Sequence, residues 1–410
     1  MTALKKVLLG NLIESVSKKH SFYKDEIIFL NTSDIYSGKV LNHEYSVVET
    51  LPGQAKKSIK KNDILFSEIR PANKRFAYVD FDSEDYVVST KLMVLRPKTK
   101  EILSKYLYYL LTSSETLQYL QSVAESRSGT FPQITFSEVS QIEIDLPSIK
   151  EQEKIIEIVE TLYKKIDVNN KIIETLEEVS NLLYKYWFID YVPFSELVES
   201  EVGLIPKGWE LTEIGQAVEV MGGGTPKTKV VEYWDNGDIE WFSPTDLTSS
   251  KTMFITSSSK KITALGLEKS SAKLFPPYSI MMTSRATIGE IAINRTESCT
   301  NQGFITLIPN DNFSMYQLYP WLKNNMDQIM LLANGSTFKE ISKTNFKKLK
   351  IVKAKRIDEY TEKSKNIFNL IDNTLKENEY LIHTIDYILP RLLKGEIDLN
   401  EVEIKVETLI

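Results

Sequence analysis

An internal repeat constrains the fold of this chain more than any other feature of its sequence. The 410 residues divide into two halves offset by 205 positions, so that Gly10 recurs as Gly215 and Asp167 recurs as Asp372. The segment SGTFPQITFSEVSQIEI in the first half resembles GSTFKEISKTNFKKLKI in the second. A duplicated sequence builds the same unit twice. We therefore predict two similar halves, each a mixed α/β globule followed by a long helical segment.

Each helical segment carries an apolar seam in alternating steps of three and four residues, which indicates an amphipathic helix with a coiled-coil face. In the first segment the seam is interrupted by Asn169 and Ser180. The seam residues are Ile155, Leu162, Ile166, Ile173, Leu176 and Leu183 in the first segment and Ile367, Ile371, Leu381 and Ile388 in the second. We predict that the two helices pack on each other in antiparallel orientation. The alternative is two separate surface helices.

The predicted fold class is α+β, with two mixed α/β globules separated by two long helices that form an antiparallel coiled coil, related by an internal pseudo-twofold repeat. The segments that we expect are a first globule, a central helical region, a second globule and a C-terminal helical region. Their predicted boundaries are residues 1–150, 151–190, 191–352 and 353–410.

Composition indicates a globular protein of a reducing compartment. The single cysteine excludes an intramolecular disulfide framework. No apolar run approaches the length of a membrane span, and the N-terminal sequence has no small-residue cleavage site, so we expect a cytoplasmic protein with no membrane partner. The net charge of −6 does not argue against nucleic-acid binding, because residues 151–200 alone hold 11 Asp+Glu against 5 Lys+Arg.

The sequence contains no convincing catalytic motif. FPPY at residues 275–278 resembles the Asn/Asp-Pro-Pro-aromatic motif of adenine methyltransferases, but Phe275 has no hydrogen-bond acceptor, so we interpret it as a proline turn. GGGTPKT at residues 222–228 lacks the spacing of a phosphate-binding loop. The three histidines are scattered, and Cys299 is best interpreted as a small buried residue. We therefore expect neither an active site nor a metal site.

Polar turns between apolar strands suggest a DNA-binding surface. The segment TSRATIGEIAINRTESCTNQGF in the second globule combines hydroxyls, an arginine and amides with a strand-like alternation of isoleucines. Arginine can contact guanine O6 and N7, and Asn or Gln can contact adenine. Hydroxyls and lysines suit phosphates. The candidates in the second globule are Thr225, Lys227, Lys229, Thr283, Ser284, Arg285, Asn301, Gln302, Ser336, Thr337 and Lys339.

The first globule offers basic clusters and a hydroxyl-rich turn. Its candidates are Lys56, Lys60, Arg70, Lys74, Arg75, Arg127, Ser128 and Thr130. For each candidate there is a structural alternative, namely that the hydroxyls support turns, that Arg285 pairs with a local acid such as Glu290, and that the lysines form a solvated basic surface.

The second globule resembles a target-recognition domain of the specificity (S) subunit of type I restriction–modification systems. The resemblance rests on GLIPKGWELTEIG, GGGTPKTK, EYWDNGDIEWFSPTDL, SSAKLFPPYSIMMTSRATIGEIAI and TNQGFITLIP. DLPSIKEQEKIIEIVETLYKKID similarly resembles the central helical region of that family. In the first globule FSEIRPANKRFAYV replaces the Ser-Arg-Ala-Thr-Ile-Gly run, so base-contacting residues cannot be carried over to it.

The resemblance implies a non-catalytic subunit with two target-recognition domains that read a bipartite site in double-stranded DNA. The helices would act as spacer and as docking sites for two methyltransferase (M) subunits, with restriction (R) subunits added in the full complex. S-adenosylmethionine would bind the M subunit, and ATP and Mg the R subunit, with no cofactor in this chain. Two alternatives remain: a stand-alone DNA adenine methyltransferase or nuclease, and a coiled-coil scaffold that binds no DNA.

Overall fold

The computed structural model describes residues 5–126, 132–334 and 339–409, arranged as two compact units. The first unit comprises residues 1–167 and 379–410, and the second comprises residues 168–378. The division passes through the middle of both long helices. Each globule therefore forms one compact body with half of each helix.

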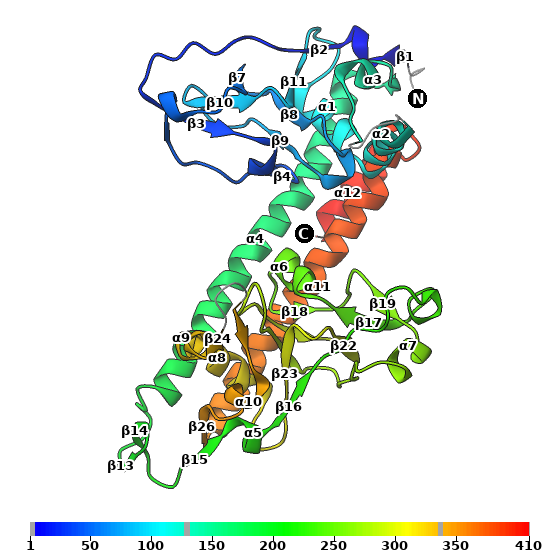
Figure 1. The fold of residues 1–410 in the computed structure, drawn as a ribbon. Helices are drawn as coiled ribbons and strands as arrows, with labels where there is room; N and C mark the ends of the chain where they lie inside the picture. The colour runs from blue at the N-terminus through cyan, green and yellow to red at the C-terminus, as the bar shows by residue number, and fades with distance from the viewer. Residues whose placement is uncertain (1–4, 127–131, 335–338, 410) are drawn as a thin grey trace. The chain divides into compact units, whose positions relative to one another are not determined.

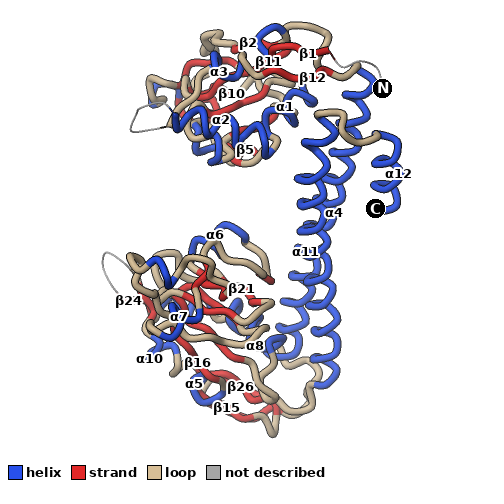
Figure 2. The backbone as a smooth tube through the Cα atoms, turned by 90° about the vertical axis from the view of Figure 1, so that its right-hand side faces the viewer, coloured by secondary structure: helices blue, strands red, loops and turns tan. Residues whose placement is uncertain are grey.

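The two long helices are α4 (Ile149–Phe188) and α11 (Asp358–Leu393). In the first unit the N-terminal half of α4 shares a core with the C-terminal half of α11, and in the second unit the complementary halves share another. The helices lie side by side (Figures 1 and 2). The predicted antiparallel packing is confirmed, and the alternative of two separate surface helices is wrong. The predicted seam residues in these cores are Ile155, Leu162, Ile166, Leu381 and Ile388 in the first unit and Ile173, Leu176, Leu183, Ile367 and Ile371 in the second.

Asn169 and Ser180 do not interrupt the packed face of α4, as the sequence suggested, because both are buried within it. The Asn169 amide donates to Oδ1 of Asn378 at 2.9 Å and to Oε2 of Glu377 at 2.8 Å, and the Asn378 amide donates to Oδ1 of Asn170 at 2.9 Å. Buried polar pairs of this kind specify the register of packed helices at some cost in stability.

A further helix, α12 (Leu399–Leu409), follows α11 and was not distinguished from it by the sequence. Gly395, at φ +66°, ends α11 in the left-handed conformation that favours glycine. Val402 and Val406 then pack against the core of the first unit, and Lys154 of α4 binds Glu403 at 2.9 Å. No helix within the described residues is long and apolar enough to cross a membrane.

The globule of the first unit contains two four-stranded sheets and two strand pairs. In order, the first sheet is β6 (Ser46–Val47), β3 (Glu26–Leu30), β10 (Tyr86–Ser89) and β7 (Ala55–Ser58). The second sheet is β2 (Ile13–Ser15), β11 (Leu92–Pro97), β8 (Ile64–Ser67) and β9 (Phe76–Tyr78). The strand pairs and helices are β1 (Lys5–Leu8) with β12 (Glu143–Leu146), β4 (Ile35–Tyr36) with β5 (Lys39–Val40), α1 (Ser104–Thr112), α2 (Ser114–Ser126) and α3 (Phe136–Ser140).

The globule of the second unit is built around a five-stranded sheet and a three-stranded sheet. The larger sheet has the order β16 (Glu219–Gly222), β23 (Phe304–Ile308), β20 (Ile280–Thr283), β21 (Ile291–Asn294) and β18 (Phe254–Ile255). The smaller sheet is β19 (Lys261–Ile262), β17 (Ile239–Phe242) and β22 (Ser298–Thr300). The strand pairs are β13 (Leu197–Ser200) with β14 (Gly203–Pro206), β15 (Glu210–Glu213) with β26 (Lys350–Lys353), and β24 (Ala333–Asn334) with β25 (Glu340–Ile341). The short helices are α5 (Ile214–Ala217), α6 (Pro244–Ser250), α7 (Ala264–Glu268), α8 (Met315–Asn324), α9 (Met326–Leu331) and α10 (Lys343–Phe346).

The sequence repeat corresponds to a structural repeat. The pair β1–β12 matches β15–β26, and the order β2-β11-β8-β9 matches β16-β23-β20-β21. The repeated glycines serve the same purpose in both units. A Cβ at Gly10 would lie 2.9 Å from Cβ of Ser140, and a Cβ at Gly215 would lie 2.7 Å from Cβ of Lys347. Only glycine allows this close approach.

Candidate nucleic-acid interface

In the second unit, three polar loops leave the same edge of the five-stranded sheet. β16 and β20 both pair antiparallel with β23, with Gly222 opposite Ile305 and Thr283 opposite Phe304. The segments after β16, after β20 and before β23 therefore meet at one edge. These segments are residues 223–229, 284–290 and 301–303, and they contain most of the candidates predicted in this globule. We call them the second-globule loops.

Hydrogen bonds fix the loop at residues 284–290. The Thr283 hydroxyl donates to the carbonyl of Thr287 and accepts from the amide of Glu290 at 3.0 Å. The amide of Ser284 donates to the carbonyl of Gly303 at 2.7 Å. Thr283 is 0% exposed and Ser284 is also buried. The prediction that these two residues contact DNA is therefore corrected: Thr283 orders the loop through its hydroxyl, and Ser284 through its backbone.

Arg285 is the side chain that this ordered loop presents. It is 44% exposed, and its Nη2 lies 2.6 Å from Oε1 of Glu340, which is 46% exposed. The local acid that pairs with Arg285 is thus Glu340 on β25, rather than Glu290 as the structural alternative suggested. The next residue, Ala286, has φ +57°, a left-handed conformation that non-glycine residues seldom adopt.

Hydrogen bonds from two tryptophan side chains fix the loop at residues 223–229. Nε1 of Trp241 donates to the carbonyl of Gly224 at 2.9 Å, and Nε1 of Trp234 donates to the carbonyl of Lys227 at 3.2 Å. The Thr225 hydroxyl donates to Oε1 of Gln302 at 2.5 Å, which joins this loop to residues 301–303. Lys227, Lys229 and Gln302 remain exposed, and so does Lys339 beside β25.

Asn301 has a structural role that the sequence did not indicate. Its Oδ1 accepts the backbone amide of Gly303 at 2.8 Å, and the backbone N–H of Asn301 donates to the carbonyl of Phe242 at 3.0 Å. This is an Asx-type turn, in which the side chain replaces a backbone acceptor. The side-chain oxygens of Asn301 and Gln302 thus each accept one hydrogen bond within the loops, and Gln302 is the more exposed of the two. That either amide contacts adenine stays a prediction.

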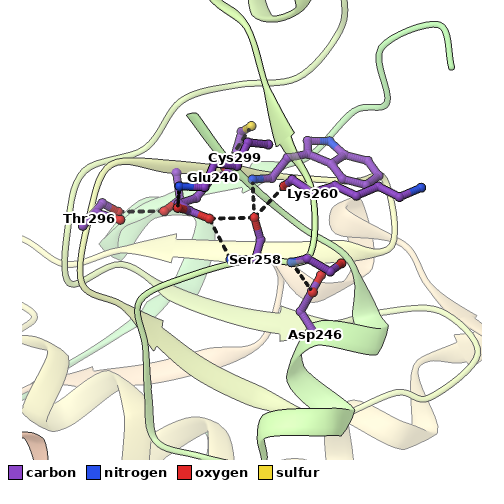
Figure 3. A network of polar contacts seen from close by, with 10 residues as sticks. Glu240, Asp246, Ser258, Lys260, Thr296 and Cys299 are labelled. Carbon is purple, nitrogen blue, oxygen red and sulfur yellow. Dashed lines mark hydrogen bonds and ion pairs between the residues drawn. The ribbon is translucent and has the colours of Figure 1, made fainter. Parts of the chain in front are cut away.

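Two carboxylates, the buried Glu240 and the partly buried Asp246, support the neighbouring segment at residues 256–260 (Figure 3). Oε2 of Glu240 accepts both the amide and the hydroxyl of Ser258 at 2.7 Å. Oδ1 of Asp246 accepts the amide of Ser259 at 2.8 Å. Burial alone would raise the pKa of Asp246, but hydrogen bonds from Ser243 and Ser259 hold that pKa below its usual value. The network presents Lys260, whose ammonium lies 5.9 Å from the Trp234 ring.

The first globule repeats this edge with a different sequence. The amide of Glu68 donates to the carbonyl of Lys91 at 3.2 Å, and the amide of Ile134 donates to the carbonyl of Glu68 at 2.9 Å. In the second globule Ser284 makes the corresponding bonds, to the carbonyl of Gly303 at 2.7 Å and from the amide of Ile341 at 3.0 Å. Residues 68–75, between β8 and β9, are therefore the structural counterpart of residues 284–290.

The counterpart loop is basic. Arg70 and Lys74 are exposed on it, and both have left-handed φ angles, of +44° and +53°. Sequence reasoning missed three exposed lysines at the same edge: Lys18, Lys19 and Lys91. The first two follow β2, and Lys91 precedes β11. Their signal was their position next to predicted strands, which becomes informative only when the strand order is known.

Two predicted DNA contacts in the first globule, Arg75 and Lys60, have surroundings that differ from those of Arg70 and Lys74. Nη1 of Arg75 donates to the carbonyls of Ser33 and Ile35 at 3.0 and 3.1 Å, so its guanidinium attaches residues 68–75 to residues 33–35. Lys60 precedes β8 and therefore lies at the opposite end of that strand from residues 68–75. Lys56 is exposed on β7, where its carbonyl accepts the amide of His20 at 2.7 Å, so it flanks the segment that follows β2.

Five predicted contacts lie outside the described residues. They are Arg127, Ser128, Thr130, Ser336 and Thr337.

Cys299 and Phe275, which the sequence did not support as catalytic residues, are both buried. Cys299 is buried, as predicted, and burial raises the pKa of its thiol to about 12, so the thiol stays protonated near neutral pH. Phe275 is buried and the chain turns at residues 277–278, which confirms the proline turn. In the part of the chain that the structure describes, no group of three or more His, Cys, Asp or Glu residues could hold a metal ion.

The chain matches the family described as "Type I restriction modification DNA specificity domain" over residues 2–178 and 206–353. It is 32% identical to the type I restriction enzyme HindI specificity subunit of Haemophilus influenzae, over 97% of this chain and 100% of that one. It is 36% identical to the MjaIX specificity subunit of Methanocaldococcus jannaschii, over 46% and 44%. A solved structure of the type I restriction–modification S subunit from M. genitalium is 15% identical, with a TM-score of 0.49, over 96% of this chain and 97% of that chain.

Two matched segments, one in each globule, together cover more than half of the sequence, and one relative is similar along its full length. The chain therefore belongs to the type I restriction–modification DNA specificity family.

Proposed function

We propose that this chain is the DNA sequence-recognition subunit of a type I restriction–modification complex and that each globule reads one half of a bipartite double-stranded site. The observation that supports this most strongly is the repeated sheet edge. Both globules present ordered, polar and basic loops from matching strands, yet the loop sequences differ. Matching scaffolds with different loops suit two readers of different half-sites, since base contacts specify the sequence and phosphate contacts position the protein.

Exchanging residues 1–150 for the first globule of another family member tests this proposal. The exchange should change one half-site and leave the other intact, because the second-globule loops belong to a separate compact unit. Mapping of methylated sites in cells that express the exchanged chain with its M subunit measures the result. A change in both half-sites together would contradict two independent readers.

Arg285→Ala should relax the recognition of one base position in the half-site read by the second globule. A bidentate arginine–guanine contact contributes about 1–3 kcal/mol of discrimination against other bases. Binding to duplexes that vary one base pair at a time measures the effect. An equal loss of affinity on every duplex would instead indicate a phosphate contact.

We further propose that the long helices dock two M subunits. Each unit leaves an apolar stripe on the outer face of one helix, and the two stripes occupy repeat-related positions. Leu182 on α4 matches Tyr387 on α11, and their exposed fractions are 63% and 61%. Val179 and Tyr186 extend the first stripe, and Tyr380 extends the second. Two equivalent apolar surfaces suit two copies of one partner.

Catalysis and its cofactors belong, in this proposal, to partner subunits: S-adenosylmethionine to M, and ATP with Mg to R. Calorimetry tests the competing proposal of a stand-alone methyltransferase, because tight binding of S-adenosylmethionine to the purified chain would favour that proposal. The scaffold proposal is separated by DNA binding, since phosphate contacts make affinity fall steeply with salt. If the chain, assembled with its partners, binds duplex DNA with an affinity that falls as salt is added, the scaffold proposal is contradicted.

A further inference from the structure

We propose that Glu340 is a specificity-determining positioning residue that holds the Arg285 guanidinium in the orientation in which it reads DNA. This inference rests on the proposed function of the second globule as a half-site reader. It assigns a role to an acidic residue on a surface whose other exposed candidates are basic or neutral.

The backbones of the two residues are fixed relative to each other. Arg285 and Glu340 face each other in an isolated antiparallel bridge, and the amide of Ile341 donates to the carbonyl of Ser284 at 3.0 Å. The bonds of Thr283 and the left-handed conformation of Ala286 fix the loop on the other side. The ion pair between Nη2 and Oε1, at 2.6 Å, therefore joins two side chains that both leave fixed positions.

The ion pair leaves the arginine able to bind a base. A guanidinium carries five N–H donors in a rigid planar fork, and the contact with Oε1 of Glu340 engages one of its nitrogens. Donors on the remaining edge suffice for O6 and N7 of guanine. A long arginine side chain loses rotamer freedom when it binds, and a partner that restricts it beforehand reduces that loss. Glu340 thus prepares Arg285 for a directional contact.

Glu340 could instead act only by repelling DNA, and that role predicts a different result. A carboxylate near DNA repels phosphates, so a residue that only repels would weaken binding to every sequence equally. Removing it would then tighten all binding without changing base preference. Removing a positioning residue instead lowers the preference for one base.

The ion pair is particular to the second globule. In the first globule the corresponding isolated bridge joins Ile69 and Gln133, which cannot form an ion pair. The two readers therefore share a backbone arrangement but differ in the side chains on it. We expect the effect of Glu340 to be confined to the half-site that Arg285 reads.

The test uses the full chain assembled with its M subunits and a set of duplexes that vary each base pair of the second half-site. Glu340→Gln should lower discrimination roughly fivefold at the base position that Arg285→Ala affects, which corresponds to the lower end of the value of one bidentate contact. Glu340→Ala should lower it further, and Arg285→Ala combined with Glu340→Ala should be no worse than Arg285→Ala alone.

The control is Glu210→Gln on β15. It removes the same charge from an exposed ion pair, in which Oε1 of Glu210 lies 2.9 Å from Nζ of Lys355, and it should leave discrimination unchanged. If Glu340→Gln strengthened binding equally to all duplexes and left discrimination unchanged, the positioning role would be wrong. Additive effects of the Arg285 and Glu340 substitutions would also overturn it. If Arg285→Ala itself leaves the half-site unchanged, the proposed reading role of Arg285 fails instead, and the two failures are thereby distinguished.

Discussion

Replacing Arg295 with methionine should lower the free energy of unfolding of the second unit by about 3–5 kcal/mol, since breaking a buried ion pair from one side leaves an uncompensated charge. Nε of Arg295 lies 2.6 Å from Oδ1 of Asp372 on α11, and the two side chains are only 6% and 11% exposed. Nη1 of Arg295 also donates to the hydroxyl of Thr256 at 2.7 Å. The pair attaches the chain after β21 to the helix.

The loss should fall towards the lower end of that range, because Asp372 retains one partner. Its Oδ2 lies 2.6 Å from Nζ of Lys376, one turn along α11. The double variant Arg295→Met with Asp372→Leu should recover much of the lost stability, since apolar side chains of similar volume often replace a buried ion pair without net cost. Lys363→Met is the control, because it breaks an exposed pair with Glu359 and should leave the free energy of unfolding nearly unchanged.

Tryptophan fluorescence during urea unfolding measures this prediction selectively. All five tryptophans of the chain lie in the second unit, so their emission reports the unfolding of that unit. They are Trp187, Trp209, Trp234, Trp241 and Trp321. A change below about 1 kcal/mol for Arg295→Met, the range of exposed pairs, would show that the buried pair is not a principal attachment of the globule to α11.

Asp372 also illustrates what the sequence could predict and what it could not. The repeat matched it with Asp167, and both residues lie on the predicted long helices. Asp167 is nevertheless exposed, whereas Asp372 is buried beneath Arg295. Heptad periodicity predicts which side of a helix packs on another helix, but it carries no information about which positions a distant loop will cover. The helix pair was therefore predictable and this contact was not.

The candidate site shows the same limit. Residue types that bind DNA also stabilise turns, and the sequence could not separate the two roles for Thr283 or Asn301. The structure separates them by burial and by the hydrogen bonds that each side chain makes. Arg285 and Gln302 remain exposed, while Thr283 and Asn301 order the loops that carry them.

The exposed basic residues at the sheet edge of the first globule could be identified only from the strand order, because no sequence motif marks them. Residues 68–75 share no motif with residues 284–290, although their place in the repeat already matched FSEIRPANKRFAYV with the Ser-Arg-Ala-Thr-Ile-Gly run. The structure supports that match through equivalent backbone hydrogen bonds of Glu68 and Ser284. Loops diverge faster than the sheet that holds them, and binding residues are concentrated on loops. A bipartite reader can therefore keep its scaffold repeat recognisable while its contact residues become unrelated.

Leu182→Asp and Tyr387→Asp should each remove one M subunit from the assembled complex, and the double variant should remove both. Fully buried interface anchors commonly contribute 2 kcal/mol or more, which corresponds to about a 30-fold weaker affinity. A charge placed in such a contact adds the cost of burying it unpaired. The two positions are repeat-related and lie in different compact units, so each substitution should affect one docking surface only.

Mass measurement of the complex, with the subunits mixed near their dissociation constant, gives the result directly as the number of M copies per chain. Both residues are largely exposed, so the fold should tolerate aspartate, and an unchanged unfolding midpoint by circular dichroism checks this. Tyr119→Asp is the matched control: Tyr119 is a tyrosine on α2 that is 49% exposed and lies on neither long helix, so the substitution should leave two M copies bound. If both single variants still bind two M subunits with unchanged affinity, the apolar stripes are not the docking surfaces, and the acidic flanks of the helices become the next surface to test.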